Sequence, residues 1–241
     1  MPMCNLAPTR TMRALGWALC VLTALLISPA PRAALEEGKN FSTVVPPQAT
    51  SQRDKIEVVE FFSYGCPHCA RFYPLLNAWV TKLPPDVLFR RVPVGFGRDA
   101  WMNLQRAYYS LETTGDLARL DGPLFRAIHE EHKPLFDESS IADWVGRNGG
   151  DAAKFTGAYI SLDVNKQSFE ADRMAENFHI EGIPALAVDG RYVAHTGGST
   201  DEAQALHELL VNTDELIARV RSERAAANAS PSATALKPKA K

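Results

Sequence analysis

Cysteine is scarce in this chain of 241 residues, which contains four. Cys4 and Cys20 lie near the N-terminus, whereas Cys66 and Cys69 stand three positions apart further along the chain. A disulfide between such close residues closes too short a loop to stabilise a fold by restricting the unfolded chain. The scarcity of cysteine therefore excludes a small domain held together by disulfides, and the close pair favours a reactive site. A chain of this length can bury a core without such crosslinks.

Neither sign of charge dominates the whole chain, which has 26 basic and 28 acidic side chains. Residues 1–33 hold three basic and no acidic side chains, and residues 221–241 hold five basic and one acidic. The body between them is acidic, with 18 basic and 27 acidic side chains, which argues against binding to nucleic acid. Residues 222–241 lack apolar periodicity and are predicted to form a disordered basic tail. This tail either has no task or makes a weak contact with an anionic membrane surface.

The N-terminal region lacks an apolar run long enough to span a membrane. Its apolar run, residues 14–27, has 14 residues, whereas a spanning helix needs about 20. Basic residues precede the run and small residues follow it, which predicts a secretory signal peptide over residues 1–33, cleaved near Ala33 or Ala34. A retained membrane anchor is the alternative. Cys20 lies inside the run rather than at its end, which argues against a lipoprotein.

The sequence also lacks a metal-binding pattern. Zinc usually takes four protein ligands, and no second paired-ligand motif accompanies Cys66 and Cys69. His129 and His132 stand at i and i+3, whereas the zinc-protease motif needs i and i+4, so the prediction for this pair is a solvated helix end. We therefore expect no metal and no cofactor beyond the redox-active cysteine pair itself.

The tetrapeptide Cys-Pro-His-Cys at residues 66–69 lies between a strand-like run, residues 55–63, and a helix-like run, residues 68–82. Unpaired backbone N–H groups and the helix dipole favour a thiolate at such a helix start. The pair therefore predicts thiol-disulfide chemistry, with Cys66 as the more exposed nucleophile and Cys69 as its buried partner. An inert bridge is the alternative for Cys66, and a packed core thiol is the alternative for Cys69.

His68 and Pro67 are predicted to set the direction of exchange. An imidazole or its cation beside Cys66 favours the thiolate, and a stable thiolate is a good leaving group. The reduced form is then favoured, and the disulfide of Cys66 and Cys69 becomes a strong oxidant. This would make the protein a disulfide donor rather than a reductant. The alternative is an exposed His68 without effect.

Strand and helix patterns alternate along the rest of the chain. A second strand is predicted over residues 87–94, and a hairpin over residues 184–194 has the turn sequence Asp189-Gly190. The residues between these beta elements follow helical periodicity. Candidate helices cover residues 100–113, 116–131, 140–147, 151–161 and 164–178. A last amphipathic helix is predicted over residues 200–221, with an interruption at residues 212–214 as an alternative.

Three features together resemble the DsbA-type thiol:disulfide oxidoreductases. They are the sequence from Glu60 to Cys69, the helical block between beta elements, and Gly182-Ile183-Pro184 before the final hairpin. The resemblance implies an α/β protein with a thioredoxin fold and an inserted all-helical domain. The predicted parts are a signal peptide at 1–33, a thioredoxin-like part at 34–97, a helical insertion at 98–170, a second thioredoxin-like part at 171–221 and the disordered tail at 222–241.

The resemblance implies a monomeric periplasmic oxidant that donates the disulfide of Cys66 and Cys69 to newly exported polypeptides through a mixed disulfide at Cys66. A quinone-linked membrane oxidase, of the kind called DsbB, would then reoxidise the pair. The resemblance also implies a cis peptide bond between Ile183 and Pro184. Their loop is expected to pack against the cysteines and to present backbone groups to an extended substrate.

The resemblance assigns roles to two further residues, and the sequence differs from the family pattern at two positions. Glu60 matches a buried acid of the family and Arg91 stands in place of its lysine neighbour, which implies a proton relay. The alternative for Glu60 is a strand end that reaches solvent. Ile183 stands where many members have valine, and Tyr73 stands where the best-known members have an acid. These departures leave the redox tuning and the choice of substrates open.

The motif leaves the direction of electron flow open, so a disulfide isomerase or a reductase is an alternative. Familiar periplasmic isomerases add an N-terminal dimerisation domain, for which residues 35–55 are too few. A different class of function is a peptide-binding holdase that works without redox turnover. Replacing Cys66 and Cys69 by serine separates the holdase from the enzyme.

Overall fold

The computed structural model describes residues 35–229. The predicted signal peptide, residues 1–33, and the end of the predicted tail, residues 230–241, lie outside the described residues. Within the described range, no helix combines the length and the apolar character that a membrane crossing needs.

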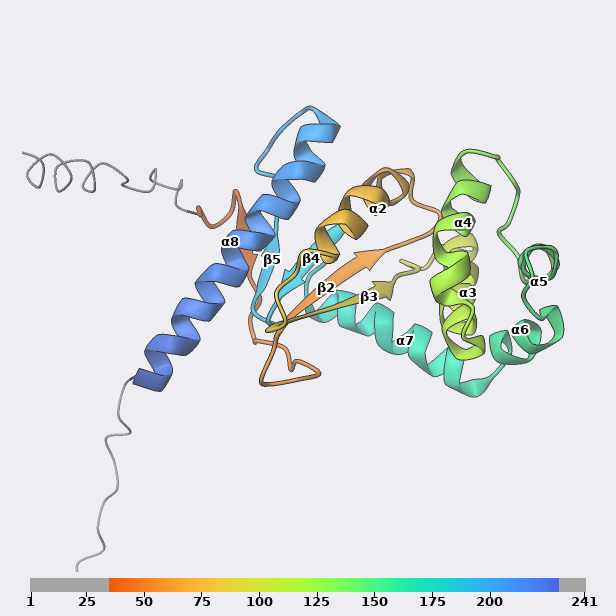
Figure 1. Cartoon of the computed structure of the whole chain (residues 1–241), viewed down its shortest axis with the longest axis horizontal. Helices are drawn as coiled ribbons and strands as arrows, with labels where there is room; N and C mark the ends of the chain where they lie inside the picture. The colour runs from red at the N-terminus through yellow and green to blue at the C-terminus, as the bar shows by residue number, and fades with distance from the viewer. Residues whose placement is uncertain (1–34, 230–241) are drawn as a thin grey trace, which may run out of the picture. The chain divides into compact units, whose positions relative to one another are not determined.

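A five-stranded mixed sheet in the order β1-β5-β4-β2-β3 forms the centre of the fold (Figure 1). Its strands are β1 (Phe41–Thr43), β2 (Ile56–Phe62), β3 (Val87–Pro93), β4 (Ala185–Val188) and β5 (Tyr192–Ala194). β2 and β3 run parallel, whereas the pairs β2 with β4, β4 with β5 and β1 with β5 are antiparallel. Every residue of β2 is buried, as expected for an apolar strand that is covered on both faces.

Helices α3 to α7 form a block between β3 and β4. The helices of the described residues are α2 (Pro67–Val80), α3 (Asp99–Thr114), α4 (Leu117–His129), α5 (Glu138–Arg147), α6 (Ala152–Tyr159), α7 (Leu162–Asn177) and α8 (Glu202–Ala229). The ends of α3 to α7 lie within about two residues of the predicted ranges. α7 continues through residue 170, where the helical insertion was predicted to end. This helix contacts α3 and α6 of the helical block and also β3 of the sheet. The division into domains at the predicted boundaries stays a prediction.

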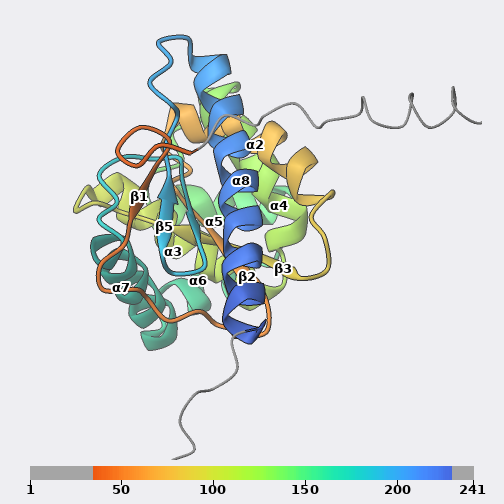
Figure 2. The ribbon, with the colours of Figure 1, turned by 90° about the vertical axis from the view of Figure 1, so that its left-hand side faces the viewer.

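Helices cover both faces of the sheet. Ile56 and Val58 of β2 belong to a buried cluster with apolar residues of α2 and α8. Phe61 points to the opposite face, where its ring centre lies 5.4 Å from that of Phe178, just after α7. Figures 1 and 2 show α2 and α8 on one side of the sheet and α7 on the other. The connection from β2 to α2 therefore places residues 66–69 where the central strand ends.

α8 runs without a break through residues 212–214, so the alternative of an interruption there is wrong. Polar side chains in this stretch find partners without breaking the helix. Asn212 Nδ2 donates to the carbonyl of His195 at 2.7 Å, and Thr213 Oγ1 donates to the carbonyl of Leu209 at 2.7 Å. The polar run is compatible with a helix because its hydrogen bonds are satisfied.

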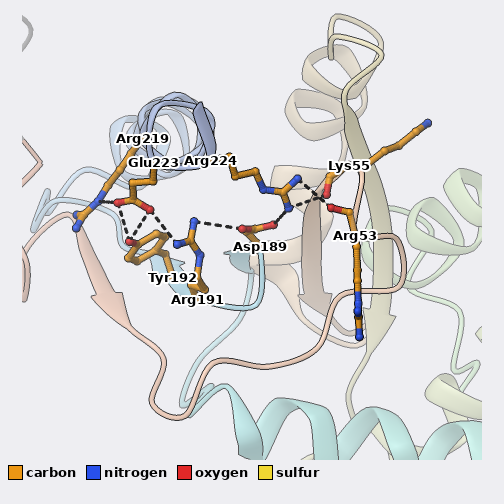
Figure 3. Close-up of polar contacts among 8 residues, drawn as sticks. All are labelled: Arg53, Lys55, Asp189, Arg191, Tyr192, Arg219, Glu223 and Arg224. Atoms are coloured by element: carbon orange, nitrogen blue, oxygen red, sulfur yellow. Dashed lines mark hydrogen bonds and ion pairs between the residues drawn. The ribbon is translucent and has the colours of Figure 1, made fainter. Parts of the chain in front are cut away.

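α8 also extends to Ala229, so the prediction of a disordered tail is wrong for residues 222–229. Contacts with distant parts of the chain explain the difference (Figure 3). Arg224 donates to the backbone carbonyl of Lys55 at 3.0 Å and forms an ion pair with Asp189. These contacts hold the last turns of α8 against the turn between β4 and β5, and apolar periodicity in the sequence cannot reveal them.

Candidate active site

Cys66 caps the N-terminus of α2, and Pro67 occupies the first turn of that helix. The backbone N–H of Cys69 donates to Cys66 Sγ at 3.4 Å. Both cysteines are free thiols in this structure. Their exposed fractions are 3% and 0%, so both residues are buried and the access to Cys66 is narrow.

The surroundings of the two thiols separate their pKa values. A hydrogen bond from the Cys69 thiol, together with the backbone N–H groups of Cys69 and His68 and the electrostatic effect of the His68 imidazole, lowers the pKa of Cys66 to about 6. Burial raises the pKa of Cys69 well above its ordinary value, and the neighbouring Cys66 and Glu60 raise it further. The reduced site therefore favours a thiolate on Cys66 and a proton on Cys69.

The loop before β4 lies against Cys66. Cys66 Sγ and the carbonyl oxygen of Ile183 are 3.6 Å apart, a distance at which the protonated form of Cys66 donates to that oxygen. The peptide bond between Ile183 and Pro184 is cis, as the resemblance implied, and β4 begins at the next residue. A second cis bond, between Val45 and Pro46, was not predicted. The Ile183 carbonyl thus covers one side of the Cys66 sulfur.

Two charged residues hold the side chain of His68. His68 Nδ1 lies 2.5 Å from Glu202 Oε1, and Arg71 Nε donates to the same oxygen at 2.8 Å. Arg71 stands one turn after His68 on α2, whereas Glu202 begins α8. Neither residue was predicted to belong to the site. Arg71 follows His68 at i+3 on the same helix, a spacing that places both side chains on one face, whereas no pattern in the sequence relates Glu202 at the start of the last helix to the tetrapeptide.

Glu60 of β2 is fully buried and lies opposite Arg91 of β3, so the alternative of a solvent-exposed strand end is wrong. Arg91 Nε donates to Glu60 Oε2 at 2.5 Å, and Arg91 Nη1 donates to Asp121 Oδ2 at 2.7 Å. Burial raises the pKa of Glu60, although the Arg91 guanidinium opposes this effect. Glu60 Oε1 has no hydrogen-bond partner among the described residues.

In the part of the chain that the structure describes, no group of three or more His, Cys, Asp or Glu side chains could hold a metal ion. His129 was predicted to lie at a solvated helix end. The structure instead places its Nε2 2.7 Å from the carbonyl oxygen of Tyr64, to which it donates a hydrogen bond. The end of α4 is therefore attached to the segment between β2 and α2.

Comparison with known proteins assigns the chain to a protein family. Residues 57–210, more than half of the chain, match the family described as the DSBA-like thioredoxin domain. The chain belongs to this family. The thiol:disulfide interchange protein DsbA of Bordetella parapertussis is 38% identical over 177 residues, which cover 73% of this chain and 82% of that protein. The protein of the same name from Pseudomonas aeruginosa is 35% identical over 184 residues, which cover 76% of this chain and 87% of that protein.

Solved structures agree with the family assignment. The crystal structure of Pseudomonas aeruginosa DsbA matches with a TM-score of 0.72 and 36% identity, and covers 80% of this chain and 97% of its own. The structure of the oxidoreductase DsbA from Xylella fastidiosa matches with a TM-score of 0.70 and 29% identity, and covers 79% of this chain and 100% of its own. The resemblance to DsbA-type proteins and the predicted class of fold, a thioredoxin fold with inserted helices, are confirmed.

In this DSBA-like chain, Tyr73, which stands where the best-known members have an acid, lies beside the network of Glu60 and Arg91. Asp121 of α4 supplies a second carboxylate to that network. The ring of Tyr73 lies 5.3 Å from the Arg91 guanidinium and carries no charge there. The carboxylate of Asp121 binds the same guanidinium and accepts a hydrogen bond from the Tyr64 hydroxyl at 2.5 Å. The second acid of the network therefore comes from the helical block, and no local pattern in the sequence marks Asp121 as part of the site.

Proposed function

We propose that this DSBA-like chain oxidises newly exported polypeptides by donating the disulfide of Cys66 and Cys69. The observation that carries this function is the position of the Cys66 sulfur at the helix cap, where hydrogen bonds lower its pKa to about 6. A stabilised thiolate favours the reduced enzyme, so the disulfide form is a strong oxidant. A reductase needs the opposite preference.

Exchange starts from the oxidised pair. A substrate thiolate attacks Cys66 Sγ, and the bond between the two cysteine sulfurs breaks. The electron pair of that bond goes to the sulfur of Cys69, which takes up a proton because burial raises the pKa of Cys69. The product is a mixed disulfide between the substrate and Cys66.

A second substrate thiolate then attacks the substrate sulfur of the mixed disulfide. Cys66 departs as a thiolate, and its low pKa makes it a good leaving group. The substrate gains one disulfide, and the two electrons stay on the enzyme as the Cys66 thiolate and the Cys69 thiol. In this step His68 stabilises the charge on Cys66, and Pro67 holds the first turn of α2.

We assign substrate binding to the loop of Ile183 and Pro184. The Ile183 carbonyl lies 3.6 Å from Cys66 Sγ, so a substrate whose sulfur is bonded to Cys66 lies next to this loop. An extended polypeptide can form main-chain hydrogen bonds with backbone groups of such a segment. Backbone recognition of this kind would suit an enzyme that acts on many sequences.

We assign proton transfer to Glu60, with Arg91 as the residue that positions it. Cys69 gains or loses a proton in each half reaction. Glu60 can exchange a proton because burial raises its pKa, and its charge acts on Cys69. The carboxylate oxygen that does not bind Arg91 is free to carry the proton.

The proposed compartment is the periplasm, which the chain reaches through the signal peptide predicted at residues 1–33. A DsbB-like, quinone-linked membrane oxidase would take two electrons from the reduced cysteines and restore the disulfide. We expect a monomer without a metal or a further cofactor. The sequence pattern of the N-terminal region and membership of the family support these assignments.

The reduction potential of the cysteine pair tests the direction of electron flow. After equilibration of the mature protein with glutathione buffers, the thiol fraction should give a potential well above that of glutathione, because the Cys66 thiolate stabilises the reduced form. A potential near that of thioredoxin would favour the reductase or the isomerase.

The double variant C66S/C69S tests the enzyme against the holdase. It should retain the fold by circular dichroism and lose all oxidation of a reduced, unfolded substrate protein. Biological activity retained by this variant would favour a peptide-binding holdase instead.

A further inference from the structure

Glu202, the first residue of α8, binds two side chains of α2. Glu202 Oε1 lies 2.5 Å from His68 Nδ1 and accepts from Arg71 Nε at 2.8 Å and Arg71 Nη2 at 2.6 Å. The side chains of His68, Arg71 and Glu202 are 58%, 50% and 40% exposed. Side chains this exposed usually move among several rotamers, so contacts from a second element are needed to hold one orientation.

The contacts fix which ring nitrogen of His68 carries the proton. Hydrogen bonds from Arg71 and His68 lower the pKa of Glu202, so its carboxylate is ionised and only accepts. Nδ1 of His68 is therefore the donor. Arg71 Nη2 lies 3.0 Å from the same Nδ1, but two donors cannot bond to each other, so both nitrogens donate to Glu202 Oε1.

Glu202 is available for this contact because another residue caps α8. Asp201 Oδ1 accepts from the backbone N–H of Gln204 at 2.8 Å, which is the usual capping bond at a helix start. The Glu202 carboxylate is thus directed to α2 rather than to its own helix. Its two partners come from the helix that Cys66 caps.

We infer that Glu202 is a positioning residue that holds the His68 imidazole beside Cys66 in one orientation and so makes the cysteine pair more oxidising. The inference rests on the proposed function and adds a residue to the control of that site. His68 acts on Cys66 through its backbone N–H and through its imidazole. A side chain that holds the imidazole in one orientation therefore keeps the electrostatic effect of that imidazole on the Cys66 thiolate constant.

The variant E202A tests the inference through the glutathione equilibrium. At a fixed buffer composition, its ratio of oxidised to reduced enzyme should rise about twofold to fivefold, because the His68 ring is no longer held and the Cys66 thiolate is less stabilised. This corresponds to a potential lower by about 10–20 mV for a two-electron couple. E202Q, whose amide oxygen still accepts from Nδ1, should restore most of the wild-type ratio.

Two controls separate positioning from general effects of charge and stability. E208A removes a carboxylate of the same helix that binds Gln204, and it should leave the ratio unchanged. In a protein that carries H68S, the further change E202A should have no effect on the ratio. Thermal unfolding of every variant in its oxidised form reports loss of stability separately.

Three results would overturn the inference. They are an unchanged ratio in E202A, an equal effect of E202A with and without His68, and a shift toward a more oxidising pair. The last is the direct effect of removing a negative charge near a thiolate. A wild-type potential near that of thioredoxin would instead overturn the proposed function, so the two failures can be distinguished.

Discussion

The guanidinium of Arg91 lies between two carboxylates in the interior. Its side chain is 9% exposed, and it pairs with Glu60, which is fully buried, and with Asp121, which is 14% exposed. The ring of Phe62 lies 3.7 Å from the guanidinium carbon and adds a cation–π contact. One positive charge cannot offset the charges of both carboxylates, and Glu60 is the fully buried one, so proton uptake by Glu60 relieves the site. This excess of negative charge is the physical basis for a proton relay at Glu60.

The variant Arg91→Met should be strongly destabilised. It leaves the carboxylates of Glu60, which is fully buried, and Asp121, which is largely buried, without their shared cation. Removal of one partner from a buried ion pair costs about 3–5 kcal/mol. Urea unfolding of the oxidised protein at neutral pH measures this loss.

A second variant tests whether the loss of stability in R91M comes from the uncompensated charge of Glu60. In E60Q/R91M the uncompensated charge of Glu60 is removed as well, so part of the lost free energy of unfolding should return. A cost for R91M below about 1 kcal/mol, as for an exposed ion pair, would contradict the buried network.

At the scale of elements, α8 is held at both of its ends. Its first residue, Glu202, contacts α2, and its last turns contact the hairpin of β4 and β5. Glu223 lies 2.9 Å from Arg191, 2.8 Å from Arg219 and 3.1 Å from the hydroxyl of Tyr192. Figure 3 shows these side chains around the Glu223 carboxylate. A helix fixed in this way keeps its first turn in a constant position relative to the active site.

Two arginines of α8 should differ in their contributions to stability. Arg224→Ala removes the donor to the carbonyl of Lys55 and the partner of Asp189, whose side chain is 8% exposed, and should cost about 1–3 kcal/mol. Arg221→Ala removes an exposed ion pair with Asp86 and should cost about 0–1 kcal/mol. Urea unfolding of the two variants tests the difference, and equal costs would contradict the role given to the last turns of α8.

At the scale of the whole molecule, the sequence predicts elements where a local pattern is strong. β2 is an unbroken apolar run, and α3 to α7 each repeat apolar residues at helical spacing. β1 has three residues, too few for a recognisable alternation, and it is a strand because it pairs with β5. The last turns of α8 lack apolar periodicity and are held by residues far away in the chain.

The candidate site divides in the same way. Cys66, His68 and Cys69 stand in one tetrapeptide, so their chemistry can be read from local sequence. Glu202 and Asp121 reach the site from α8 and α4, and their contacts exist only in the assembled fold. Within its own helix each of these acids looks like a solvent-exposed residue, and no local spacing marks it as part of the site.

The stability of the reduced protein should depend on pH through Cys66. Its pKa is about 6 in the folded protein and near the ordinary 9.0 in the unfolded chain, so the unfolded chain binds more protons between these values. The free energy of unfolding of the reduced form should therefore rise with pH across this window. The rise should be roughly 2–3 kcal/mol between about pH 5 and about pH 8, and it is lost again as the pH falls through the folded pKa.

The oxidised protein supplies the matched comparison for this pH profile, because neither sulfur titrates in a disulfide. Other groups titrate in both forms, so subtracting the two urea profiles isolates the cysteine pair. The raised pKa of Cys69 acts above about pH 9 and does not enter the window. Reduced C66S should lose the pH-dependent difference. Parallel profiles for the reduced and oxidised wild-type protein would mean that the fold does not stabilise the Cys66 thiolate, and the oxidising character of the pair would then have no source at Cys66.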